Sequence, residues 1–286
     1  MHSGYPEEAL FVSARNRRAC ARFADALAAF SRGNFALAAR CVKAYRDLVR
    51  PDDFYRHEGR GADVPLLSLI VVAYGTTTDL LECLASVHAG TFRKMEVIVI
   101  DNGGNAPVLP KLTALPLLYV KTPMNLLPAE GRNIGVSLAR APIGVFLDDD
   151  ALAAPNFLQS ALEVFGEPAV MAARGRILPK NDAACQSADP HYDPGEKPLP
   201  YLINIEGNSA WRLEAYRLLG GMDPLLFGHE GYDLSLRLVR LYGESSSIYR
   251  PSMLVRHDFA LTPEKKAAKT ARYALMSRYL KWKNKG

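Results

Sequence analysis

Hydrophobic and polar positions follow two different patterns along the chain. Up to about residue 60, hydrophobic residues recur every three or four positions in two segments, which is the spacing of amphipathic helices. They are Ala19, Phe23, Ala26, Leu27 and Phe30 in the first segment, and Phe35, Ala38, Cys41, Val42, Tyr45 and Leu48 in the second. The pattern predicts an N-terminal α-helical hairpin over residues 1–60, weakly similar to half of a tetratricopeptide repeat. The polar, glycine-rich stretch "RHEGRGADVP" is expected to be a linker.

From residue 64 the pattern changes to short, continuous hydrophobic runs, which are typical of strands buried on both faces. Such runs are "LLSLIVVAY", "MEVIVID", "LPLLYVK" and "IGVFLD", and helical segments such as "TTTDLLECLASVHA" and "AEGRNIGVSLARA" lie between them. This alternation predicts an α/β fold with a Rossmann-like, mostly parallel sheet and helices on both faces. Ligands of such sheets bind beyond the carboxyl ends of the strands.

After residue 155 the order of elements is looser. A helix is predicted at "NFLQSALEVF", a strand at "AVMAARGRI", a helix near "GYDLSLRLVRLYG" and a strand near "MLVRHDF". A basic helix then covers residues 263–286, and its hydrophobic residues favour packing on the domain over lying on an anionic membrane. We therefore expect three parts: the hairpin, a main domain over residues 64–262, and the basic helix.

Composition narrows the protein class. The chain has 286 residues, 49% of them hydrophobic, which is enough for a full core. The net charge of +5 suits an anionic partner, although a plain basic surface is equally compatible with it. Four scattered cysteines indicate a reducing compartment, and no signal peptide or membrane span is apparent. We expect a cytoplasmic protein that could also lie peripherally on the inner face of the membrane, with no nucleic-acid partner.

Three adjacent carboxylates, Asp148, Asp149 and Asp150, directly follow a hydrophobic run. Carboxylate oxygens suit Mg²⁺ or Mn²⁺, which keep open positions for phosphate oxygens. The alternative is a solvated acidic loop, but the end of a buried strand is the expected binding edge and favours a metal site. His257 follows another short strand, and its imidazole could complete that site or simply form a hydrogen bond.

Other polar residues allow two interpretations each. Asp101, before "NGGN", could accept a hydrogen bond from a nucleotide base or form a turn. Arg132 could meet phosphate or an acidic neighbour. Glu230 and Asp233 open a helix, whose dipole stabilises acids there, and either could act as a general base. Trp211 could stack on a sugar or fill the core, which is the commoner fate.

Six segments in order make residues 66–259 resemble the family 2 glycosyltransferases of the GT-A fold. They are "LSLIVVAYG" with "LLECLASV", "EVIVIDNGG", "AEGRNIGVSLARAPIGVFLDDDA", "GNSAWRLEAYRLLGGMDPLLF", "HEGYDLSLRL" and "VRH". Any one of these segments alone is weak evidence for the family, but six of them in the family's order are a specific match.

The resemblance implies a nucleotide-sugar donor, usually linked to UDP, and a role for each matching residue. Ala73 and Tyr74 would line the base pocket, Asp101 would contact the uracil, Arg132 would lie near the nucleotide or its diphosphate, and Asp148 to Asp150 would form the DxD motif. In that motif Asp148 points toward the ribose, Asp149 stands beside the nucleotide, and Asp150 binds metal with His257. Gly207, Asn208 and Trp211 would line the sugar and acceptor pocket.

One position departs from the family pattern. The family commonly has Glu-Asp, one further residue and an acid, whereas this chain has Glu230, Gly231, Tyr232 and Asp233. The missing middle Asp is often the base of inverting members. Either Glu230 or Asp233 takes that role, or the mechanism is retaining; we expect inversion on family grounds.

Together these patterns predict a metal-dependent glycosyltransferase. It would move a sugar from a nucleoside-diphosphate donor, expected to be UDP-linked, to a hydroxyl of a saccharide, lipid-linked or small-molecule acceptor, as in polysaccharide biosynthesis. One alternative is a nucleotidyltransferase, which would be expected to carry a Gly- and Lys-rich phosphate loop after the first strand. The segment there, "AYGTTTD", contains no Lys or Arg, which argues against this alternative. Another alternative is a catalytically impaired scaffold that binds sugar nucleotides. Gly231 is evidence for this alternative, and the three Asp residues are evidence against it. The hairpin could bind a protein partner or a second copy.

Overall fold

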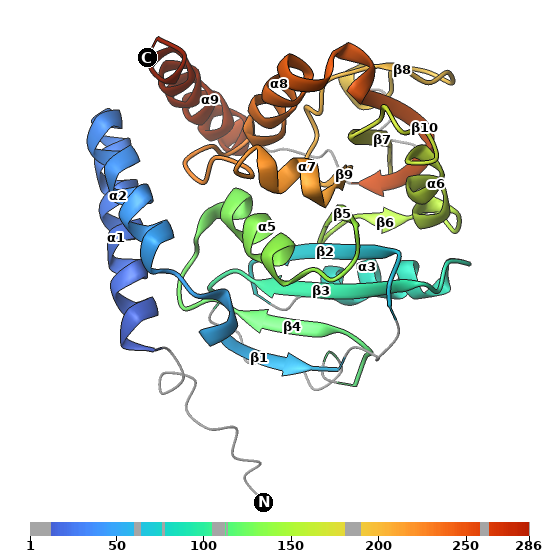
Figure 1. Ribbon diagram of the computed structural model, residues 1–286, viewed down its shortest axis with the longest axis horizontal. Helices are drawn as coiled ribbons and strands as arrows, with labels where there is room; N and C mark the ends of the chain where they lie inside the picture. The colour runs from blue at the N-terminus through green and yellow to red at the C-terminus, as the bar shows by residue number, and fades with distance from the viewer. Residues whose placement is uncertain are drawn as a thin grey trace, which may run out of the picture.

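The protein folds around one ten-stranded sheet with helices on both faces (Figure 1). The computed structural model describes residues 13–59, 64–75, 78–104, 112, 114–180, 190–257 and 263–285. One hydrophobic cluster lies between the sheet and helices α3 (Thr78–Ala89) and α6 (Phe157–Val164). A second cluster lies between the other face and helices α5 (Leu127–Leu138), α7 (Leu213–Leu218) and α8 (Glu230–Tyr242). The predicted α/β architecture is confirmed.

The first half of the sheet is parallel, as the continuous hydrophobic runs predict. It contains β2 (Leu67–Ala73), β3 (Met95–Asp101), β4 (Leu118–Lys121) and β5 (Ile143–Asp148), in the spatial order β4-β3-β2-β5. Nearly every residue of β2, β3 and β5 is buried, because helices cover both faces.

The prediction of a linker over "RHEGRGADVP" is wrong for its first residues, which belong to a strand. Residues Tyr55–Glu58 form strand β1, which pairs antiparallel with β4 at the edge of the sheet. Burial alternates along β1 between half-buried and exposed positions, so its pattern lacks the continuous hydrophobic run of the central strands. Before β1, Pro51–Asp53 form a short 3₁₀ turn.

The second half of the sheet is mixed. Strand β9 (Asn208–Arg212) lies antiparallel between β5 and β7 (Ala172–Pro179), and β10 (Ser247–His257) runs parallel to β7. Two short strands, β6 (Leu152–Ala153) and β8 (Leu199–Pro200), pair antiparallel with β10. Further 3₁₀ turns cover Pro190–Tyr192 and Glu244–Ser246. Because β9 runs against β5, the residues just before β9 lie at the carboxyl end of β5.

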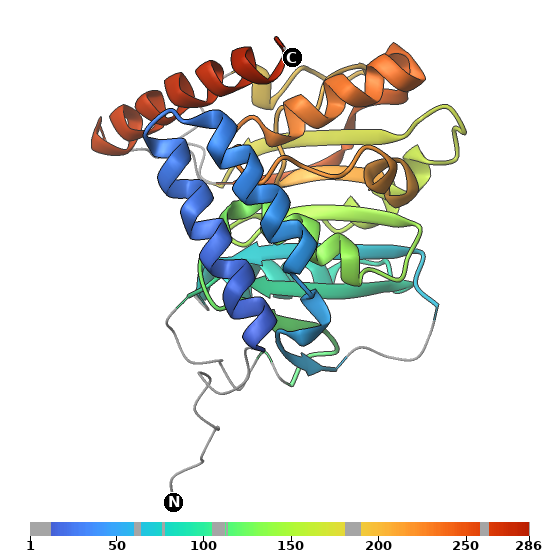
Figure 2. The same ribbon diagram turned by 60° about the vertical axis from the view of Figure 1, so that its left-hand side comes forward.

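The predicted N-terminal hairpin is confirmed as helices α1 (Ala14–Ser31) and α2 (Phe35–Leu48). The side chains of Ser13 and Asn34 cap these helices by accepting backbone N–H bonds. The C-terminal helix α9 (Pro263–Lys283) crosses the end of the hairpin (Figure 2). Its Tyr279 ring lies 5.1 Å from Phe30 and 5.4 Å from Phe35, so α9 packs on the protein as its hydrophobic residues suggest. The exact borders of the three parts remain predictions.

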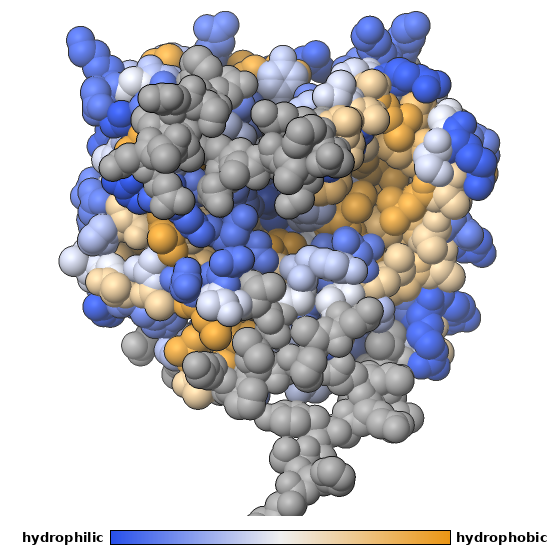
Figure 3. Space-filling view, turned by 180° about the vertical axis from the view of Figure 1, so that it is seen from behind, coloured by the Kyte–Doolittle hydropathy of each residue, from blue (hydrophilic) through white to orange (hydrophobic). Residues whose placement is uncertain are grey.

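No described helix has the length and hydrophobicity needed to cross a lipid bilayer. The face opposite to Figure 1 shows hydrophilic residues across its centre and hydrophobic residues gathered at one side (Figure 3).

Candidate active site

Three central strands end level with one another. In the parallel register Ala73 of β2 lies opposite Asp101 of β3, and Val72 lies opposite Asp148 of β5. The polar residues that follow these strands therefore meet at one edge, where an α/β sheet binds ligands. Ala73 is buried, whereas Tyr74 is largely exposed at this edge.

Asp101 ties two loops together at the edge. Its Oδ1 accepts N–H bonds from Gly75 at 3.2 Å and Gly104 at 3.1 Å, and its Oδ2 accepts the Tyr119 hydroxyl at 2.6 Å. The residue is fully buried. These bonds match the turn-forming interpretation, and they engage both carboxylate oxygens.

Arg132 of α5 joins two acids from distant parts of the chain. Its Nη2 donates to Oδ1 of Asp148 at 3.0 Å, and its Nη1 donates to Oε1 of Glu230 at 3.2 Å. Burial by itself lowers the pKa of Arg132, but the nearby Asp148, Glu230 and Glu206 outweigh it and raise the pKa. The guanidinium is thus a permanently charged centre of the site, and the expected acidic neighbours are present.

Asp150 and His257 meet across the site. The Nε2 of His257, at the end of β10, lies 2.9 Å from Oδ1 of Asp150. Pairing of β6 with β10 brings them together, because β6 begins two residues after Asp150. Burial raises the pKa of Asp150, but its hydrogen bond to His257 and the charge of His257 reverse the shift and lower it. Burial and the neighbouring Asp150 and Asp148 raise the pKa of Asp149 to about 7.

Gly207 lies directly against Asp148. Its carbonyl accepts the Asp148 N–H at 3.2 Å, and a Cβ added at Gly207 would lie 1.9 Å from the Asp148 carboxylate. A side chain at this position is therefore excluded, and Gly207 lies beside Asp148; its expected contact with a sugar stays a prediction.

Asn208 and Trp211 lie in the core instead, which corrects the expectation that they line the sugar pocket. Asn208 is fully buried and donates to the carbonyls of Arg176 and Met253. Trp211 is fully buried as well, and its Nε1 donates to Ser209 Oγ at 3.1 Å. Strand β9 is central in the sheet, so these side chains face the protein interior.

Glu230 and Asp233, the two candidate bases, are both held by protein donors. Glu230 is 2% exposed, and its oxygens accept from Arg132 and from the Gly228 N–H. Asp233 points to the α9 side, where it binds Arg237 and Lys283.

Glu206 is a site acid that the sequence pattern did not reveal. It precedes Gly207, and its Oε1 accepts the Gly231 N–H at 2.9 Å. Burial and the nearby Glu230 raise the pKa of Glu206, against a smaller lowering by Arg132. The missing acid at residue 231 was the signal that could have pointed to a replacement elsewhere.

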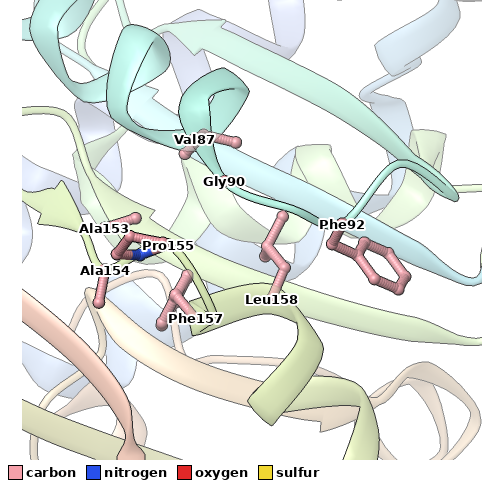
Figure 4. A pocket seen from close by; sticks show the side chains of 8 residues that line it. All are labelled: Val87, Gly90, Phe92, Ala153, Ala154, Pro155, Phe157 and Leu158. Carbon is pink, nitrogen blue, oxygen red and sulfur yellow. The ribbon is translucent and has the colours of Figure 1, made fainter.

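Two hollows away from the strand ends are poorer sites. A pocket between α3 and α6 holds about 10 Å³, roughly one water molecule, and apolar groups line it (Figure 4). A larger hollow of about 460 Å³ lies between α2, α9 and the α7–α8 segment. Its charged groups already pair with one another or with backbone carbonyls, among them Lys43 with Asp47 and Lys283 with Asp223.

The residues at the strand ends fit a divalent cation that shares its coordination with a ligand. Among the described residues, no group of three or more His, Cys, Asp or Glu side chains is arranged to hold a metal without help. The close Asp150–His257 pair and the half-exposed Asp148 nevertheless offer two carboxylates and one imidazole. This donor set suits Mn²⁺ or Mg²⁺ when diphosphate oxygens supply the remaining ligands.

The sequence matches a known family over the segment that builds this edge. Residues 68–202 match the family described as "Glycosyl transferase family 2". This part of the chain belongs to glycosyltransferase family 2. The family segment contains β2, β3 and β5 with Asp101, Arg132 and the three Asp residues.

The curated proteins that the chain matches are distant relatives. The chain is 27% identical over 184 residues to a pre-mycofactocin glycosyltransferase of Mycobacterium tuberculosis, covering 59% of this chain and 38% of that protein. It is 31% identical over 118 residues to a validoxylamine A glucosyltransferase of Streptomyces hygroscopicus, covering 39% of this chain and 28% of that protein. The chain thus spans well under half the length of these relatives.

Solved structures confirm the GT-A-like fold. The mannosyltransferase PcManGT from Pyrobaculum calidifontis, in complex with GDP-Man and Mn²⁺, has a TM-score of 0.60 and 17% identity, covering 96% of this chain and 76% of that one. Residues 1–349 of TarS from S. aureus give a TM-score of 0.54 and 16% identity, covering 67% of this chain and 60% of that one.

Proposed function

We propose that this family 2 protein is a metal-dependent glycosyltransferase that moves a sugar from a nucleoside diphosphate to an acceptor hydroxyl. One observation carries the proposal: Asp148 ends β5 and Asp150 comes two residues later, and Arg132 holds the first while His257 holds the second. Partly exposed acids with separate cationic partners are suited to receive a cation bridged to a diphosphate.

Each residue of the site has a defined part in this proposal. Asp148, Asp150 and His257 would hold Mn²⁺ or Mg²⁺, which supplies neutralising charge to the departing diphosphate. Arg132 fixes Asp148, and Gly207 leaves room for it. The nucleotide would lie on the side of Tyr74, Asp101 and Asp149. Asp101 would act there by holding the loop that begins at Tyr74, through its bond to the Gly75 N–H.

The donor is best treated as two candidates. The family resemblance favours a UDP-linked sugar, whereas the structural neighbour PcManGT binds GDP-Man. The acceptor is a hydroxyl of a saccharide, a lipid-linked sugar or a small molecule. A cytoplasmic location agrees with the cysteines, because the three described ones, Cys20, Cys41 and Cys83, are free thiols.

Donor binding and turnover test the proposal. The protein is mixed with UDP-glucose, UDP-N-acetylglucosamine, GDP-mannose or TDP-glucose, each with Mn²⁺, Mg²⁺ or EDTA, and nucleoside diphosphate release is measured beside calorimetric binding. We expect metal-dependent binding and release for one donor, lost in Asp150→Asn. The matched control Asp25→Asn removes an exposed acid of α1 and leaves both unchanged.

Two results would contradict the proposal. Absence of binding to every donor in the presence of metal would favour the scaffold interpretation. Release of pyrophosphate from a nucleoside triphosphate and a sugar phosphate, without transfer from any diphosphate donor, would establish the nucleotidyltransferase instead.

A further inference from the structure

Transfer to a hydroxyl requires an acceptor for its proton, and this requirement selects among the acids near Asp148. Glu230 has both oxygens engaged by Arg132 and Gly228 and is almost fully buried. Asp233 has both oxygens engaged by Arg237 and Lys283 on the opposite side of α8. Each of the four carboxylate oxygens of these two acids therefore already accepts from at least one other residue of the protein.

Glu206 differs from both. Within the described part of the chain, the Gly231 N–H is the one hydrogen-bond donor from another residue to its carboxylate, and it binds Oε1. The backbone N–H of Glu206 itself also interacts with this carboxylate. Among the described residues, no other side chain donates to Oε2, and the residue is half-buried.

The carboxylate of Glu206 occupies the space beside residue 231. A Cβ added at Gly231 would lie 2.9 Å from Glu206 Oε1, 3.0 Å from its Cγ and 2.9 Å from the Ile203 carbonyl oxygen. An acidic side chain at residue 231 would therefore start directly against the Glu206 carboxylate. The absence of a side chain at Gly231 and the presence of Glu206 are two parts of one arrangement.

Glu206 is also adjacent to the donor edge. The next residue, Gly207, contacts the Asp148 carboxylate and accepts its N–H bond. The backbone that carries Glu206 is thus fixed against the acid proposed to face the diphosphate.

We propose that Glu206 is the general base of the transfer reaction, in place of an acid at residue 231. This inference rests on the proposed function. The acceptor O–H gives its proton to Oε2 of Glu206, and the acceptor oxygen forms a bond to the anomeric carbon of the sugar. The bond from that carbon to the diphosphate oxygen breaks, and its electron pair leaves with the nucleoside diphosphate. Attack from the face opposite the leaving group inverts the anomeric centre.

The surroundings of Glu206 favour proton acceptance once it is ionised. Four charged or titratable groups from other elements interact with it: Glu230 of α8, Tyr273 of α9, Arg132 of α5 and Arg174 of β7. Burial first, then Glu230, raise its pKa, and Arg132 lowers it less. An acid with a raised pKa is a stronger base above that pKa.

The test compares three variants with the wild type, using the donor that the wild type binds with Mn²⁺. Acceptors are p-nitrophenyl glycosides, with water as the acceptor in their absence. Glu206→Gln should bind the donor within about threefold of the wild type but lose at least about 100-fold in turnover. Its rate should also lose the rise with pH that ionisation of Glu206 gives the wild type. Glu163→Gln, an exposed acid on α6, is the matched control.

Moving the carboxylate from residue 206 to residue 231 tests whether the loss of turnover comes from the missing base or from a disturbed structure. In Glu206→Gly combined with Gly231→Asp, the Glu206 side chain no longer blocks an acid at residue 231, and only the Ile203 carbonyl must shift slightly to admit it. We expect turnover to recover at least about tenfold over Glu206→Gln. Normal turnover and an unchanged pH profile in Glu206→Gln would overturn the base assignment while leaving the proposed function intact. Lost donor binding in that variant would overturn it too, by making Glu206 a binding residue. Failure of the wild type to bind or turn over any donor would instead overturn the proposed function.

Discussion

Two groups of acids, one between α8 and α9 and one at the strand ends, differ in how fully other residues of the protein engage them. On the α9 side, Lys283 Nζ lies 2.8 Å from Asp223 and 3.1 Å from Asp233, and Arg237 adds two further bonds to Asp233. On the sheet side, Asp148 and Asp150 have one cationic or imidazole partner each and remain 38% and 45% exposed. Saturated acids fix one element to another, whereas acids with free oxygens can bind a ligand or accept a proton. The following predictions test this division.

Removal of Arg132 should have the largest effect, because this residue belongs to both kinds of interaction. In Arg132→Met, the almost fully buried Glu230 loses its cation and Asp148 loses its anchor. We expect about 3–5 kcal/mol of lost unfolding free energy, as for other broken buried pairs, and loss of donor turnover. Urea unfolding and nucleoside diphosphate release measure the two effects.

Arg22→Met provides the comparison for that variant. Arg22 forms an exposed pair with Asp25 on α1, for which we expect less than about 1 kcal/mol. Equal losses in the two variants would show that burial of Glu230 does not matter to the Arg132 interaction.

The sequence predicts those parts of the site whose residues stand in a recognisable pattern with their neighbours along the chain. Strands β2, β3 and β5 are buried on both faces, so each one appears as a hydrophobic run that ends in a polar residue. Asp101 and Asp148 could therefore be placed at the same edge before the structure was known. Strand β1 was missed because its residues are polar and half-exposed.

The part of the site that escaped prediction depends on contacts between distant segments. Glu206 lies in an irregular segment before β9, and nothing in "INIEGNS" marks it as chemical. Its significance comes from Gly231, 25 positions later, and from the antiparallel placement of β9 beside β5. Likewise, the Lys283 bond to Asp233 spans 50 positions, so the engagement of that acid was invisible in the sequence.

Gly207→Ala should affect the ligand-binding acids more than the fold. The new Cβ would overlap the Asp148 carboxylate, which must move to relieve a 1.9 Å approach. We expect donor affinity to fall at least about tenfold, with about 1–3 kcal/mol of lost stability from overpacking. Calorimetry with Mn²⁺ measures the affinity. Gly166→Ala, whose Cβ meets only the Glu163 carbonyl at 3.2 Å, serves as the control, and equal affinities in both would contradict close packing at Gly207.

Lys283→Met should lower stability while sparing the chemistry. It removes the shared cation of Asp223 and Asp233, and we expect a loss of about 1–3 kcal/mol, with kcat within about twofold of the wild type. Burial raises the pKa of Asp223, but Lys283 and the hydrogen bonds outweigh it and lower the pKa. A lowered folded-state pKa stabilises the protein above the unfolded-state value and loses that effect as the pH falls through the folded-state value. The stability difference should therefore be full at pH 7 and shrink in acid.

The smallest effect is expected for Lys43→Met, which removes the same kind of charge from an exposed pair. Lys43 and Asp47 lie 2.9 Å apart on α2, as close as the pairs of Lys283, but their side chains are 79% and 64% exposed. Water and salt screen such a pair, so we expect a loss below about 0.5 kcal/mol that disappears in high salt. A loss as large as that of Lys283→Met would show that distance alone sets the energy of these pairs. A small loss would show that the larger effect of Lys283 comes from its burial and from the second acid that it holds. The same two properties separate the acids that fix α9 from the acids left open at the strand ends.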